Sequence, residues 1–216
     1  KTDALLLKCR TCKSKKIVTY DELLGEQGEE IASDLSRLCF DQLVLTSFPS
    51  SGSYAVSLPS YGELSFASVA KGCAADNAVE AMRQAGVTSA IISLGGNVQT
   101  LGVKPDGTNW NVAVQDPNNT ASYLGVVSVG ETAVVTSGNY QRFFTDARGT
   151  TYHHIINPSS GYPVTNTLQS ATIICSDGTL ADCLSTAMFV LGESRAINYW
   201  RTYGGFEMIL VTKENQ

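Results

Sequence analysis

Two oxygen-bearing side chains stand out in a segment that is otherwise apolar. The stretch from Leu180 to Gly192 reads as a buried helix, yet it carries Asp182 and Thr186 four residues apart. On a helix this spacing places both oxygens on one face, about one turn apart. In that position both oxygens can coordinate the same hard cation. Alternatively, Asp182 caps the first turn and Thr186 bonds back to a helix carbonyl. The spacing leaves both interpretations open.

Both histidines of the chain are adjacent, at His153 and His154, ahead of two turn-forming clusters of proline and glycine. Neighbouring residues of a strand point to opposite faces, so one ring faces inward and the other outward. Imidazole takes a proton near neutral pH, which makes the ring that faces a cleft a candidate general base. A structural histidine held by hydrogen bonds is the alternative.

Two further segments are suited to an anion. The run from Val135 to Tyr140 ends a predicted strand in small polar residues, and a turn there can offer N–H groups to a phosphate. Lys71 and Gly72 open an alanine-rich helix, which brings a cation to the positive end of the helix dipole. An ordinary polar turn and an ordinary helix start explain the same residues.

Composition and missing motifs exclude several classes. The formal net charge of -5 argues against a nucleic-acid partner. No apolar run approaches the roughly 20 residues that span a bilayer. GxGxxG, GxxxxGK[ST] and GxSxG are all absent, so Rossmann, Walker and α/β-hydrolase interpretations lose their support. Cys9 and Cys12 have CxxC spacing, but no second pair follows to complete a zinc site.

Helices and strands are mixed along the chain, without an internal repeat or a linker composition. Apolar periodicity predicts a helix within 21–38, where Ile31, Leu35 and Leu38 form one stripe. It predicts three more helices over 69–85, 180–191 and 194–203. Strands are predicted over 42–46, 54–58, 90–94, 110–114, 124–129, 132–136 and 206–212. The run 90–94 is continuously apolar, which predicts a strand buried on both faces. The fold class is therefore α+β, with a mixed or antiparallel sheet flanked by helices.

Five motifs follow one another along the chain: Val69-Ala-Lys-Gly-Cys-Ala-Ala-Asp76, Leu94-Gly-Gly-Asn97, Thr136-Ser-Gly-Asn-Tyr140, His153-His-Ile-Ile-Asn-Pro158 with Gly161-Tyr-Pro163, and Ala181-Asp-Cys-Leu-Ser-Thr-Ala187. Together and in this order they closely resemble the ApbE family, the FAD:protein FMN transferases. The resemblance covers most of the chain, from about residue 31 onward, and leaves 1–30 as a poorly assigned segment before a domain at 31–216. The family is usually longer at its N-terminus.

The resemblance assigns roles to particular residues. It implies that magnesium lies between Asp182, Thr186 and an oxygen of Ser68. It implies that His154 deprotonates the acceptor hydroxyl. The flavin-nucleotide pocket would be lined by Ser65, Lys71, Ser137, Gly138 and Ile155.

Three positions depart from the family pattern. Ser65 replaces an acidic residue, Cys73 stands where tyrosine is frequent, and Asn157 replaces the aspartate before Pro158. The first change bears on contacts with FAD.

The implied reaction is Mg²⁺-dependent transfer of FMN from FAD onto a Ser or Thr hydroxyl of an acceptor flavoprotein, with release of AMP. The family also implies a bacterial, extracytoplasmic location through a signal or lipid anchor outside this chain. Two alternatives stay open: hydrolysis of FAD to FMN and AMP, and a flavin-nucleotide binding module without turnover. A zinc-stapled interaction protein built on Cys9 and Cys12 is a further, weaker hypothesis.

Overall fold

The computed structural model describes residues 26–38, 40–146 and 149–213. The helices in this part are α2 (Glu26–Ser36), α3 (Ala70–Gln84), α4 (Gly178–Leu191) and α5 (Glu193–Tyr203), with a short 3-10 turn at Phe40–Gln42. The strands are β1 (Val44–Phe48), β2 (Ser53–Ser57), β3 (Ala90–Leu94), β4 (Asn97–Leu101), β5 (Trp110–Gln115), β6 (Tyr123–Val129), β7 (Ala133–Gly138), β8 (Phe143–Thr145), β9 (Thr151–His153), β10 (Leu168–Cys175) and β11 (Glu207–Thr212).

Five of the strands form the main sheet, in the order β11-β10-β7-β4-β3. Every neighbouring pair is antiparallel. Strands β7 and β10 pair over six residues, from Ser170 opposite Gly138 to Cys175 opposite Ala133. The antiparallel sheet and its helices confirm the predicted α+β class.

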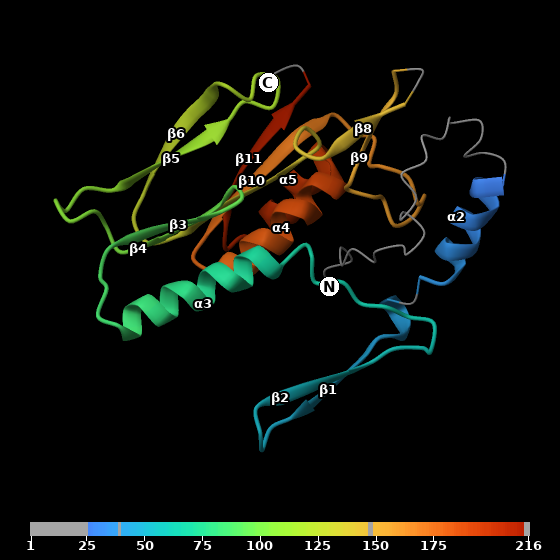
Figure 1. The fold of residues 1–216 in the computed structure, drawn as a ribbon, viewed down its shortest axis with the longest axis horizontal. Helices are drawn as coiled ribbons and strands as arrows, with labels where there is room; N and C mark the ends of the chain where they lie inside the picture. Colours follow the sequence, from blue (N-terminus) through green and yellow to red (C-terminus); the bar gives the residue numbers. More distant parts are fainter. Residues whose placement is uncertain (1–25, 39, 147–148, 214–216) are drawn as a thin grey trace.

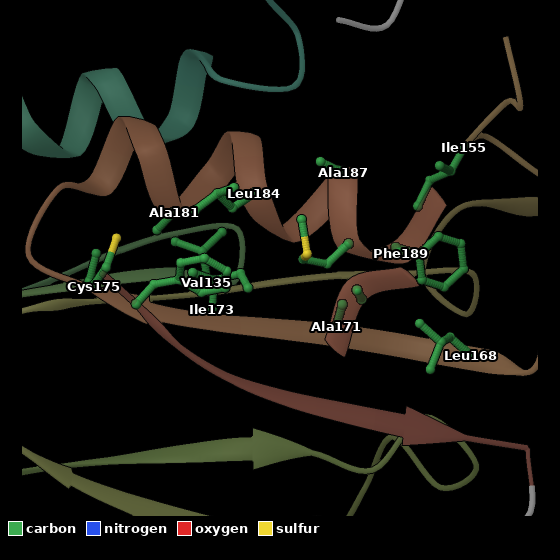
Figure 2. Close-up of a cluster of buried hydrophobic side chains, with 14 of the residues drawn as sticks. Val135, Ile155, Leu168, Ala171, Ile173, Cys175, Ala181, Leu184, Ala187 and Phe189 are labelled. Atoms are coloured by element: carbon green, nitrogen blue, oxygen red, sulfur yellow. The ribbon is translucent and has the colours of Figure 1, made fainter. Parts of the chain in front are cut away.

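The core lies between this sheet and α4. Helix α4 packs across β7 and β10, so side chains of both strands meet the apolar helix. Figure 2 shows Phe189 and Leu184 of α4 on the same side of the sheet as Val135 and Ile173. Each such side chain contributes about 1.5–3 kcal/mol of hydrophobic stabilisation when fully buried. This packing fixes which face of α4 remains for polar residues.

Helix α3 lies beside α4, and glycine permits the close approach (Figure 1). A Cβ atom at Gly72 would overlap the carbonyl oxygen of Gly178 and lie 2.8 Å from Asp182 Cβ. Only a residue without a side chain fits between the two helices at this point. The start of α3 is therefore held directly against Asp182.

Helices α3, α4 and α5 each begin and end within two residues of the predicted bounds. The part of the predicted helix 21–38 that the structure describes is α2. Its stripe packs on the turn after β9, because a Cβ at Gly161 would meet Ile31 and lie 3.4 Å from Leu35 Cγ. No helix in the described ranges is both long and apolar enough to cross a bilayer.

The predictions for the strands need two corrections. Strand β3 is not buried on both faces: it is an edge strand of the sheet, and Ile91 is 47% exposed. The expected turn at Ser137 and Gly138 is wrong as well, because both residues belong to β7 and pair with β10. Apolar patterning does not predict strands β4, β8, β9 and β10. Cys9 and Cys12 lie outside the described residues.

Candidate functional site

Asp182 is the central residue of the candidate site, and its side chain is buried. The residue is 3% exposed on α4, and its Oδ2 accepts a hydrogen bond of 2.9 Å from the main-chain N–H of Gly72. The carboxylate therefore reaches out of its own helix to the first turn of α3. A negative charge is favoured there, because the N–H groups of a helix start carry partial positive charge.

The capping alternative for Asp182 is wrong. The N-cap of α4 is Asp177, whose side chain accepts a hydrogen bond from Leu180 N. The Thr186 hydroxyl faces strand β7 instead of its own helix, and its Oγ1 lies 3.0 Å from Ser137 Oγ. Both oxygens of the predicted pair therefore face neighbouring elements.

The charge on Asp182 lacks a basic partner within the described ranges. The ion pairs found there join Arg83 to Glu80 and to Glu131. A carboxylate out of water and without a counter-charge is costly. A hard cation beside Asp182 and the Thr186 hydroxyl would compensate it, so the residues present fit a magnesium ion.

A cation here would need hydroxyl and main-chain oxygens as well as the carboxylate. In the part of the chain that the structure describes, no three His, Cys, Asp or Glu side chains are grouped to hold a metal. Hydroxyl groups are plentiful, because Ser137 Oγ also lies 2.8 Å from Ser185 Oγ. Strand β7 thus brings Ser137 to the Ser185 and Thr186 hydroxyls of α4, and its role in the nucleotide pocket stays a prediction.

The segment that leads into α3, together with the first turn of that helix, supplies three more predicted site residues. Ser68 is half-buried, one turn ahead of Gly72, and Lys71 is half-buried in the first turn of the helix. Ser65 lies in the preceding loop, where its Oγ accepts a hydrogen bond of 3.4 Å from Ala67 N. The contact between Gly72 and Asp182 places this segment at α4. The role of Ser68 as a metal ligand and the roles of Ser65 and Lys71 in the nucleotide pocket stay predictions.

His153 is the structural histidine. The residue is 9% exposed, its Nε2 lies 3.0 Å from Val164 O, and its Nδ1 accepts a bond of 3.3 Å from Ile155 N. These partners fix a neutral ring with the proton on Nε2. The ring meets the edge of Phe189 in the core. Burial is the main cause that lowers the pKa of His153, and the charge of Lys213 lowers it further.

His154 is the exposed histidine, as the opposite faces of a strand require. Its Nδ1 lies 3.2 Å from the carbonyl oxygen of Arg142, which can only accept, so Nδ1 carries the proton. Nε2 then holds the lone pair that a general base uses. Partial burial lowers the pKa of His154, and the charges of Arg142 and Lys71 also lower it, so the base form persists at neutral pH.

Two predicted pocket residues serve mainly as framework. Ile155 is 2% exposed within the core cluster, and its main-chain N–H is already bonded to His153. Gly138 is buried in β7, where a Cβ would lie 2.7 Å from Gln169 O and 2.6 Å from the ring of Tyr140. The contact of either residue with a nucleotide stays a prediction.

Asp76 is a site residue to which the sequence motifs assign no role. Its carboxylate accepts hydrogen bonds from Gly178 N, Thr179 N, Thr179 Oγ1 and Gln99 Nε2, at 2.6–2.9 Å. Burial acting alone would raise the pKa of Asp76, but these hydrogen bonds outweigh it and hold the pKa below its usual range. Asp76 thereby ties α3 and β4 to the start of α4, the helix that carries Asp182. Its place at the end of the first motif is the one sequence signal that points to it.

Burial of His153 makes the stability of the fold depend on pH. The pKa of His153 is lower in the folded protein than its ordinary value of 6.5, so the unfolded chain binds the proton more readily. Stability from this residue is full above about pH 6.5 and is lost as the pH falls toward the folded pKa. We expect the melting temperature to fall between about pH 7.5 and 5.5, more steeply in the wild type than in His153→Gln. Equal slopes in calorimetry would contradict this, since His154 is present in both proteins.

Fold and site together define a class of protein. It is an α+β domain with an antiparallel sheet, in which a buried helix carries a carboxylate and a hydroxyl that could hold a hard cation beside the start of a second helix. An exposed, neutral histidine follows a short strand nearby. Comparison with known proteins identifies the family to which this fold belongs.

The chain belongs to the ApbE family, whose sequence model matches residues 14–210. A protein of Treponema pallidum, named FAD:protein FMN transferase, is 34% identical over 205 residues, which are 90% of this chain and 56% of that protein. A protein of Klebsiella pneumoniae with the same name is 38% identical over 70% of this chain and 46% of its own length. The chain thus spans about half the length of these curated relatives.

Solved structures agree in fold. The ApbE protein of Thermotoga maritima superposes with a TM-score of 0.77 at 29% identity, over 92% of this chain and 63% of that one. The flavinyl transferase ApbE of Pseudomonas stutzeri superposes with a TM-score of 0.72 at 25% identity, over 94% and 58%. The described fold is therefore that of the family.

Proposed function

We propose that this chain transfers FMN from FAD onto a Ser or Thr hydroxyl of an acceptor flavoprotein and releases AMP. The observation that carries the proposal is the buried Asp182 carboxylate, which has one N–H donor and no basic partner in the described ranges. Membership of the ApbE family and the names of the relatives support the same reaction.

We place Mg²⁺ with Asp182, Thr186 and Ser68. When bound there, the ion would neutralise charge on the diphosphate of FAD. Asp182 contributes the one full negative charge, and Thr186 a neutral oxygen on the same face of α4. Lys71 and the N–H groups at the start of α3 would favour an anionic substrate over a neutral one.

His154 would accept the proton of the attacking hydroxyl at Nε2. The hydroxyl oxygen forms a bond to the phosphorus on the FMN side, and the bond from that phosphorus to the oxygen bridging to AMP breaks. AMP leaves with the bridging oxygen, and FMN stays attached by a phosphoester. The Arg142 carbonyl keeps the Nδ1 proton in place, which holds the lone pair on Nε2.

Hydrolysis is the second candidate, because the His154 ring is exposed and water can reach it. Water in place of the protein hydroxyl would convert FAD to FMN and AMP. By family resemblance, we also propose that the native protein works outside the cytoplasmic membrane of a bacterium, through an anchor beyond this chain. Fractionation of the source cells tests that location.

The test of the function is a mass measurement. The purified chain is incubated with FAD, Mg²⁺ and a flavin-accepting domain, and we expect the acceptor to gain the mass of FMN while AMP appears in equal amount. AMP without labelled acceptor would identify hydrolysis instead. Tight FAD binding without AMP would identify a module that binds the nucleotide and does not turn over.

His154→Gln should lower the rate of labelling about 10²–10⁴-fold, the usual contribution of a general base. The amide keeps a donor near the Arg142 carbonyl but cannot take up a proton. FAD binding, followed by flavin fluorescence, should change little. Labelling at the wild-type rate would rule out His154 as the base.

A further inference from the structure

We propose that the outer edge of β8 is the docking edge for an extended segment of the acceptor protein. This inference rests on the proposed function, because it names the macromolecular partner of the same site. Strand β8 pairs with β9 alone in the described part of the chain. Figure 1 shows the two as a ribbon of their own, outside the five-stranded sheet.

The hydrogen bonds of the ribbon fix which main-chain groups point outward. His154 N donates to Arg142 O, and Asp146 N donates to Thr150 O, so the even-numbered residues of β8 face β9. In an antiparallel ladder the bonded residues alternate with those that turn away. The N–H and C=O groups of Phe143 and Thr145 therefore point to the outer edge.

The outward groups lie in a setting that suits a peptide. All three residues of β8 are exposed, and Phe143 and Phe144 are each 56% exposed. Their rings lie on opposite faces of the ribbon, because neighbouring side chains alternate. An added strand would gain main-chain hydrogen bonds from the edge and apolar contact on both of its faces.

The edge leads directly to the general base. Arg142, whose carbonyl holds the His154 ring, is the residue immediately before β8. A segment that pairs with Thr145 and Phe143 therefore leaves the strand beside Arg142, the residue to which His154 is bonded across the ribbon. This continuity favours the acceptor as the occupant, since its hydroxyl must reach His154 on a stretch of extended chain.

A second copy of this chain is the competing occupant. Pairing of β8 with β8 of another molecule would bury the same edge. It would make the chain a dimer and would hinder the acceptor rather than help it. A variant that cannot pair at this edge should therefore label more slowly if the acceptor binds there, and faster if a second copy of the chain binds there.

Thr145→Pro is the variant that tests the edge. Proline has no N–H and is tolerated in an edge strand where that N–H points outward. Thr145→Ala is the matched control, because it keeps the N–H and removes the same hydroxyl contact with Thr151 Oγ1. Steady-state labelling gives KM for the acceptor and, separately, KM for FAD. Light scattering gives the mass of each protein.

We expect Thr145→Pro to raise KM for the acceptor about tenfold, as the loss of a main-chain hydrogen bond implies, with KM for FAD unchanged. Thr145→Ala should label as the wild type does. Equal acceptor KM in the proline and alanine variants would overturn the inference, as would a wild-type dimer that Thr145→Pro converts into a faster-labelling monomer. A wild type that labels no acceptor would overturn the proposed function and this inference together, whereas normal labelling by both variants would overturn the inference alone.

Discussion

Asp182→Ala is expected to abolish Mg²⁺-dependent transfer of FMN to the acceptor. The substitution removes the buried negative charge that accepts the N–H of Gly72 at the start of α3. A bound divalent ion is worth several kcal/mol of charge stabilisation, so the labelling rate should fall about 10³-fold or more. The measurement is the mass of the acceptor over time across a titration of Mg²⁺.

Two further variants separate the effect of losing the Asp182 charge from the effect of disturbing the helix. Asp182→Asn keeps an oxygen to accept the N–H of Gly72 and removes only the charge, so it should fold normally and still fail to respond to Mg²⁺. Asp177→Asn removes an exposed carboxylate at the start of the same helix and keeps a good N-cap, so it should label normally. Wild-type labelling by either Asp182 variant would refute the metal assignment.

The largest effect on stability is expected from Gly72→Ala. Alanine inside a helix normally stabilises it by about 1 kcal/mol relative to glycine. Here the added methyl group would overlap the carbonyl oxygen of Gly178, a main-chain atom that cannot rotate away. Helices α3 and α4 must separate, at a cost of about 3 kcal/mol in the free energy of unfolding, the upper end for overpacking.

The expected change in the free energy of unfolding is opposite in sign to that of the same substitution in an ordinary helix, so the measurement can distinguish the two cases. Gly125→Ala on β6 is the control, because a Cβ there meets nothing within 4 Å and that variant should match the wild type. Denaturant unfolding of both variants gives the comparison. A Gly72→Ala protein as stable as the wild type would mean that α3 does not lie against α4 as described. Since the Gly72 N–H also binds Asp182, the variant should need more Mg²⁺ for labelling.

Local sequence determined the helices and the identities of the reactive groups. Apolar periodicity and a terminal glycine are local signals, so they predict α3 and α4 nearly to their ends. The i, i+4 spacing of Asp182 and Thr186 is enough by itself to put both oxygens on one face of α4. The adjacent histidines had to face opposite ways, and they do.

These local signals could not predict which strands pair when the strands are far apart in the sequence. Strand β10 contains Thr172 and Ser170 among its apolar residues, so its pattern is broken, and its place in the sheet comes from partners more than 30 residues away in sequence. Strand β3 resembles an interior strand because its residues are all apolar or small, yet its position at the edge of the sheet depends on which strands pair with β4.

The candidate site, too, was predicted from the sequence only in part. The sequence supplied a carboxylate, a hydroxyl, a lysine and a histidine suited to phosphoryl transfer. Only the tertiary structure decided that Asp182 binds the start of α3 rather than capping α4, since Gly72 lies 110 positions earlier in the chain. It also decided which histidine is buried and which is exposed, because that depends on the side of the β8–β9 ribbon that the core covers. The chemistry that a side chain can perform follows from its residue type, which the sequence shows directly. Its burial and its hydrogen-bond partners follow from packing between segments that are far apart in the sequence, so only the tertiary structure shows them.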